Sequence, residues 1–243
     1  MRITKVEPIP MLVELPAGTK APISVPFAEQ TASTIFKGYR TCLVRVHTDD
    51  GLTGVGECMT RLAPRATAAV VGEAGEVLRG IDPVETSVAW ELMFALMMNR
   101  GHLKGFFMEA ISGIDVALWD LKGKILNRPV YELLGGAQRQ KIWACASSLR
   151  FRGTEATVEE AKEFVARGYQ AMKLKIGKSP HRFEADLELA TAVRQAVGRY
   201  LSVCRCELRN GAHRRHATRA RIGEAQLRLV RGAARARRPR WVC

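Results

Sequence analysis

Two lysines separated by one residue, Lys173 and Lys175 in "AMKLKIG", have the clearest potential for chemistry in this 243-residue chain. Residues two apart on a strand project from the same face. If that face lines a closed interior, the two ammonium groups crowd each other, and burial further disfavours the charged form. One of them could then take a proton from a substrate as a general base. On an isolated edge strand, the same pair would simply face solvent.

The elements around this pair alternate between strand and helix from Lys141 onward. Such alternation predicts parallel βα units of the kind that build a barrel. A third strand should begin near Leu201, and the pattern is lost there. The expected elements are strand 141–148, helix 157–168, strand 169–177 and helix 182–198.

The first part of the chain has a different pattern. Apolar residues alternate over 2–15 and 39–58, and Asp49-Asp50-Gly51 is a turn signal, so we expect an antiparallel meander. Residues 16–36 hold three prolines and no sustained period, which predicts a long loop. Helices are expected over about 65–79, 83–99 and 107–125, the last with the strongest apolar period. Strands followed by helices indicate an α+β unit.

Three segments together resemble the mandelate racemase and muconate lactonizing branch of the enolase superfamily. They are "DGLTGVGEC" at 50–58, "ISGIDVALWDLKGKILNRPVYELLGG" at 111–136 and "MKLKIG" at 172–177. The resemblance covers roughly residues 1–199. It implies an α+β capping domain followed by an incomplete (β/α) barrel of the enolase type.

The resemblance also implies domain limits. We expect the capping domain at 1–126 and the start of the barrel, about two βα units, at 127–199. A disordered arginine- and alanine-rich tail should follow at 200–243. The 111–136 motif should pack the cap against the barrel, and Asp115 and Asp120, five residues apart, are poor candidates for a metal pair.

In the family, the second lysine of this pair removes the proton α to a carboxylate, and the first tunes it. Carried over, the base is Lys175 and its tuner is Lys173. The reaction would be that of a racemase, a cycloisomerase or an acid-sugar dehydratase acting on a small hydroxy acid or sugar acid. Loop 16–36 and segment 57–65 would close over the substrate, and the resemblance implies a homo-oligomer.

The family also uses Mg²⁺, held by three carboxylates at the ends of the next three strands, to offset the charge of the enolate. After Glu188 this chain has only two acidic residues, Glu207 and Glu224. Neither lies in a matching motif. We therefore expect this chain to bind no Mg²⁺ and to be inactive.

The positive charge of the chain is concentrated at its end. Residues 201–243 hold 12 of the 38 basic residues, all arginine, against two glutamates, whereas the net charge of the whole chain is +14. One alternative is therefore a nucleic-acid-binding protein that uses a basic C-terminal arm. A basic arm usually mixes lysine with arginine and adds aromatic residues, and this one has no lysine, so we expect only nonspecific binding to polyanions.

A shifted reading frame explains the same composition. Read one base out of phase, the codons for Cys204 to Glu207 permit Val-Asp-Ala-Asn, and those from Leu229 permit Trp-Phe-Glu-Glu-Pro. These resemble the third- and fourth-strand metal motifs of the family. Our hypothesis is a chain frameshifted and truncated after about residue 199.

Neither a secretory signal nor a membrane span fits the sequence. The N-terminal apolar stretch is short and is interrupted by Pro8 and Pro10. The six cysteines lack the spacing of a disulfide framework or a metal site. We therefore expect a cytoplasmic protein with reduced thiols and no membrane partner.

Overall fold

The structure is a computed structural model that describes residues 1–14, 38–60, 63–102, 104–149, 153–176, 183–198 and 201–205. Its contacts separate two units, and the change from the first to the second falls between Gln140 and Lys141. The sequence placed the start of the second domain at residue 127. Loop 16–36 and residues 206–243 lie outside the described residues, and each unit is considered by itself.

The first unit contains a three-stranded antiparallel sheet in the order β1-β2-β3, as the alternation predicted. Pro8 and Pro10 fit into β1 because it is an edge strand, where a missing N–H removes no ladder bond. Gly51 has a φ of 86° in the turn between β2 and β3, a conformation that favours glycine. The strands are β1 (Ile3–Glu14), β2 (Gly38–Thr48) and β3 (Thr53–Cys58).

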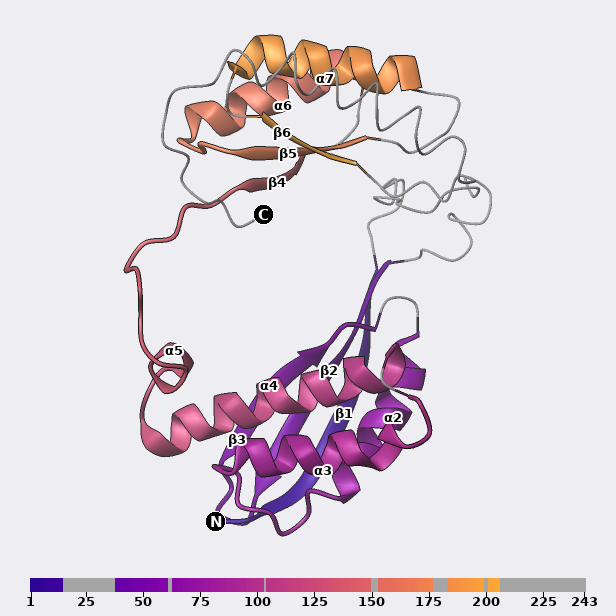
Figure 1. The fold of residues 1–243 in the computed structure, drawn as a ribbon, viewed down its shortest axis with the longest axis vertical. Helices are drawn as coiled ribbons and strands as arrows, with labels where there is room; N and C mark the ends of the chain where they lie inside the picture. The colour runs from indigo at the N-terminus through magenta and orange to yellow at the C-terminus, as the bar shows by residue number, and fades with distance from the viewer. Residues whose placement is uncertain are drawn as a thin grey trace. The chain divides into compact units, whose positions relative to one another are not determined.

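Helices cover one face of this sheet (Figure 1). The predicted helix at 83–99 begins only at Thr86, because the Asp82 carboxylate accepts the backbone N–H of Val84 at 3.0 Å in a preceding turn. The 107–125 helix is confirmed and ends at Asn127, which has a φ of 50°. The helices are α2 (Pro64–Glu76), α3 (Thr86–Met98), α4 (Phe106–Leu126) and the short α5 (Val130–Leu133).

Close packing between α4 and β3 joins the two layers. A Cβ atom on Gly56 would lie 2.1 Å from the carbonyl oxygen of Gly113, and one on Gly54 would lie 2.1 Å from that of Ala117. Only glycine permits this approach. The apolar face of α4 is thereby buried in one core with the inner faces of the strands; its fully buried residues include Ile111, Ile114, Leu118 and Leu121.

The second unit is a parallel three-stranded sheet in the order β4-β5-β6, with both crossover helices on one face (Figure 1). The strand predicted from Lys141 begins only at Ala146. Residues 201–205, at the start of the segment that the sequence assigned to the tail, pair with β5 as a third parallel strand. The elements are β4 (Ala146–Leu149), α6 (Thr154–Ala166), β5 (Met172–Ile176), α7 (Phe183–Val197) and β6 (Leu201–Arg205).

Candidate active site

The two lysines of interest lie on β5, the central strand of the parallel sheet. Met172 and Leu174 of this strand are fully buried, in a core shared with residues of α6 and α7. Side chains alternate between the faces of a strand. Lys173 therefore lies on the face of the sheet opposite the two helices, the face that becomes the interior when such a sheet closes into a barrel, and Lys175 stands two residues further along the same strand.

The register shows which positions adjoin the lysines. Lys173 pairs with Ser147 of β4 and with Ser202 of β6, while Lys175 pairs with Cys204. Ser147 is exposed and Lys173 is partly exposed. A hydroxyl and an ammonium group are thus carried side by side on adjacent strands, on a face that the described helices leave uncovered.

Lys175 is also the last but one residue of β5. The carboxyl ends of parallel strands gather at one edge of a sheet, and binding sites in βα folds form at that edge. In its position at the end of a central strand, Lys175 differs from lysines that lie on the outer surface of a helix. Lys162, for example, lies on α6 and pairs with Glu159 at 2.7 Å.

The described residues do not fit the magnesium ion that the resemblance implies. No group of three His, Cys, Asp or Glu side chains among them could hold a metal. Strand β6 carries Ser202, Cys204 and Arg205 and no carboxylate. Mg²⁺ prefers carboxylate and other hard oxygen ligands, so these residues offer no suitable set.

The acidic residues of α4 have structural contacts. Asp120 Oδ2 accepts the backbone N–H of Val55 at 2.8 Å and the Lys124 ammonium at 2.7 Å, which ties the helix to β3. Burial raises the pKa of Asp115, and a hydrogen bond with Trp119 opposes this effect. Neither carboxylate joins a metal-binding cluster in the described part of the chain.

Cys42 and Cys58 are free thiols, as expected. Cys42 and Cys58 face each other across β2 and β3 in the core of the first unit. Burial raises the pKa of the Cys58 thiol to about 12. A thiol in this state is a poor nucleophile, and these two residues act as small apolar side chains in the core.

Sequence reasoning missed Ser147. The run "ASS" near the end of a predicted strand was a weak signal. What places Ser147 beside Lys173 is the parallel register, which shifts between Ser147 and Leu149. A register shift of this kind depends on how the strands pack. It cannot be predicted from the pattern of apolar residues in the sequence.

Comparison with known proteins agrees with this architecture. Residues 17–135 match the N-terminal domain of the mandelate racemase / muconate lactonizing enzyme family. The chain is 36% identical over 180 residues to a D-galactarolactone cycloisomerase of Agrobacterium fabrum, covering 72% of this chain and 46% of the relative. It is 34% identical over 166 residues to a D-galactonate dehydratase of Variovorax paradoxus, covering 65% and 42%.

Solved structures give the same result. A member of the enolase superfamily from Polaromonas sp. JS666 superimposes with a TM-score of 0.79 at 30% identity, covering 94% of this chain and 57% of that one. The 3,6-anhydro-D-galactonate cycloisomerase of Zobellia galactanivorans gives 0.72 at 28% identity, covering 93% and 56%. The chain spans less than half the length of the cycloisomerase of Agrobacterium fabrum and the dehydratase of Variovorax paradoxus.

The fold is an α+β capping domain followed by part of a (β/α) barrel of the enolase type. The chain belongs to the mandelate racemase / muconate lactonizing enzyme family. In the described residues, no helix is both long enough and apolar enough to cross a bilayer.

Proposed function

We propose that this chain carries the cap and the first barrel strands of an enzyme that removes the proton α to the carboxylate of a sugar acid or hydroxy acid. The observation that carries the proposal is that Lys173 and Lys175 stand two residues apart on β5, with Lys175 next to the carboxyl end of this strand. Relatives named for D-galactonate and D-galactarolactone support a sugar-acid substrate class. A cytoplasmic homo-oligomer is part of the same proposal.

In the proposed step, Lys175 Nζ accepts the proton from the α carbon. The electron pair of the broken C–H bond moves toward the carboxylate and leaves an enolate. Lys173 lies on the same face, and its positive charge disfavours a second ammonium group at position 175. Lys173 thus helps to keep Lys175 available as a base.

We further propose that the chain as it stands does not complete this reaction. An enolate formed from a carboxylate concentrates negative charge that has to be stabilised. The family does this with a metal ion, and the described residues of this chain do not fit one. Proton abstraction alone would therefore not lead to turnover.

Activity of purified protein tests both parts of the proposal. The full chain should not turn over D-galactonate with Mg²⁺ present. A protein expressed after restoring the shifted frame should be active, lose all measurable activity on Lys175→Ala and keep it on Lys162→Ala. Turnover by the unaltered chain would overturn the proposed inactivity, and an active Lys175→Ala protein would overturn the assigned base.

The frame hypothesis has its own direct test in the nucleotide sequence. Codons downstream of residue 200, read one base later, should encode an uninterrupted barrel with an Asp codon spanning positions 205 and 206. A stop codon in that frame, or codons that do not encode the Val-Asp-Ala-Asn motif, would reject the hypothesis. This result does not depend on whether the protein folds.

A further inference from the structure

Helix α3 has an apolar stripe that the described part of its unit leaves uncovered. Val88, Leu92 and Leu96 are 46%, 38% and 39% exposed. They stand four residues apart and therefore form one ridge along the helix. The side of α3 next to this stripe is already in use, since Ala89 and Met93 are buried in the core of the unit.

A shallow depression, open to solvent, lies along this ridge. It is lined by Ser87, Val88, Glu91, Leu92 and Ala95. Ser87, Glu91 and Ala95 form the neighbouring ridge, and two of these three side chains are small. A ridge of apolar side chains beside a row with small side chains is a surface that another helix can pack against.

The stripe is complementary to itself in an antiparallel arrangement. With a two-fold axis next to Leu92, Val88 of one copy lies opposite Leu96 of the second, and the two Leu92 side chains meet at the centre. This is the isologous contact that a two-fold dimer requires. Antiparallel helices also bring the opposite ends of their dipoles together.

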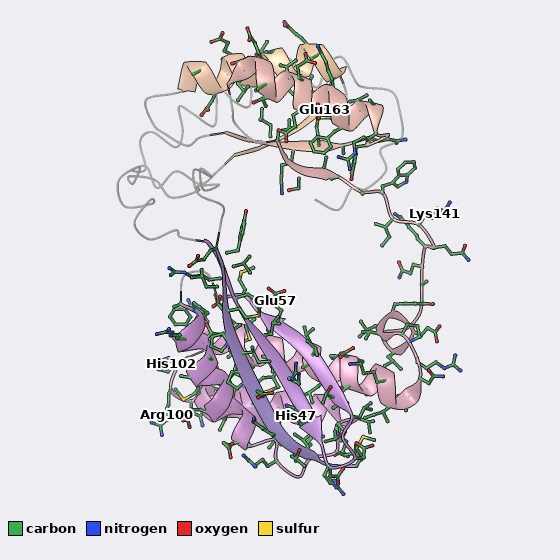
Figure 2. The ribbon with its side chains drawn as sticks, turned by 180° about the vertical axis from the view of Figure 1, so that it is seen from behind. His47, Glu57, Arg100, His102, Lys141 and Glu163 are labelled. Atoms are coloured by element: carbon green, nitrogen blue, oxygen red, sulfur yellow. The ribbon has the colours of Figure 1, made fainter. Side chains whose placement is uncertain are left out.

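The two ends of α3 carry opposite charges that an antiparallel pair of helices would bring together. Glu85, exposed at the N-cap, and Arg100, exposed just beyond the C-cap Asn99, stand at nearly equal distances along the chain from Leu92. Neither forms an ion pair with another residue in the described ranges. Figure 2 labels Arg100 at the margin of the unit, in the connection that follows α3.

We propose that two copies of this chain associate through α3, with the helices antiparallel around Leu92 and Glu85 of each copy paired with Arg100 of the other. The surface is a single helix of 13 residues from each copy. Stable dimers usually bury well over 1,000 Å² in total. The dimer should therefore dissociate on dilution.

Sedimentation equilibrium on the purified full chain at physiological salt tests the proposal. The chain should self-associate as a monomer and dimer, and Leu92→Glu should weaken this at least tenfold. Val116, 50% exposed on α4, provides the matched control, so Val116→Glu should leave association unchanged. A chain that stays monomeric, or variants that associate equally, would overturn the proposal in favour of an unpaired α3 or a contact elsewhere.

A charge exchange tests the register of the pair. Glu85→Arg alone should weaken association, and adding Arg100→Glu should restore it, whereas failure of the double variant to recover would overturn the antiparallel arrangement. If Leu92→Glu does not fold, Leu92→Cys replaces it. Under mild oxidation it should give a dimer linked through residue 92 that Val116→Cys does not give; equal cross-linking of both variants would contradict the interface.

Discussion

Glu7 interacts with three basic side chains on the face of the antiparallel sheet that the described helices leave open. Its carboxylate lies 2.9 Å from His47 Nε2, 3.1 Å from Lys5 Nζ and 3.9 Å from an Arg45 nitrogen. Figure 2 looks onto this face and labels His47 there. The hydrogen bonds with His47 and then Lys5 lower the pKa of Glu7 below its ordinary value of 4.5.

The sign of the resulting pH dependence follows from the lowered pKa. A carboxylate whose pKa is lower in the folded state contributes stability above its unfolded pKa, and this is lost as pH falls through the folded value. Glu7→Gln should therefore lower the melting temperature at pH 7, and the difference from the unaltered chain should shrink near pH 3. Circular dichroism melts check this. The effect should be small, because the site is exposed.

Glu73 on α2 offers a matched control because it is an exposed carboxylate without an ion pair in the described residues. Glu73→Gln should change the melting temperature similarly at both values of pH. A Glu7→Gln effect of equal size at pH 7 and pH 3 would contradict the proposed role of the ionised carboxylate.

For single residues, the sequence predicted the strand that carries Lys173 and Lys175, because alternation along a strand is a local rule. It did not predict Ser147 as their neighbour. That neighbour depends on the register between two strands separated in sequence by a helix. Glu7 and His47 were likewise not connected, since their contact requires the pairing of β1 with β2.

Among the elements, α4 and β3 depend on each other through glycine. Alanine at position 56 would place a Cβ 2.1 Å from the Gly113 carbonyl oxygen and 2.7 Å from the Ala117 nitrogen. Both are backbone atoms, so the helix would have to move away from the sheet. Gly56→Ala should lower the free energy of unfolding by about 3 kcal/mol, at the upper end of what overpacking usually costs.

Denaturant titration of the first unit measures this change, and Gly72 is the control. Gly72 lies inside α2, and a Cβ there would meet nothing within 4 Å. Gly72→Ala should therefore stabilise the unit by up to about 1 kcal/mol, the difference in helix propensity. If both substitutions had the same sign, close packing would not explain the glycine at position 56.

Element prediction succeeded where a long period was present and failed at boundaries. The apolar period of α4 extends over 21 residues, so its position was predicted almost to the residue. The start of α3 was missed because Asp82 stabilises a turn before it. The short α5 was not predicted, since four residues carry no period, and it is followed by Gly135 and Gly136 with φ of 106° and 90°.

For the whole molecule, the two units differ in how completely their sheets are supported. The antiparallel sheet has helices packed along it and a core that includes three helices. Both sheets have three described strands and therefore two edge strands each, but the second sheet is parallel. Parallel sheets in proteins are normally covered on both faces, and here the described helices cover one.

We expect this difference to appear in native-state hydrogen exchange. Backbone amides of β2 and α4 should exchange much more slowly than those of β5 and α7, because the first unit has the larger buried core and local opening of the second unit therefore costs less free energy. Exchange measured by mass spectrometry resolves the two units in one sample. Equal protection of β2 and β5 would contradict the expectation.

The arginine-rich end of the chain raises a separate question about the whole molecule. The 11 arginines after Arg205, set against Glu207 and Glu224, will attract any polyanion. Such binding releases counterions, so its affinity falls steeply with added salt. The composition includes no arrangement that would distinguish one base sequence from another, since phosphate contacts carry no sequence information.

We therefore predict weak DNA and RNA binding that is uniform across sequences and disappears as salt is raised. The measurement compares the full chain with a version that ends at Arg205, which retains β6. Fluorescence anisotropy with two unrelated duplexes should show similar affinities for the full chain and a large loss for the shorter one. A preference of more than about tenfold, or roughly 1.4 kcal/mol, at physiological salt would identify the arginines as a selected recognition element and reject the frame hypothesis.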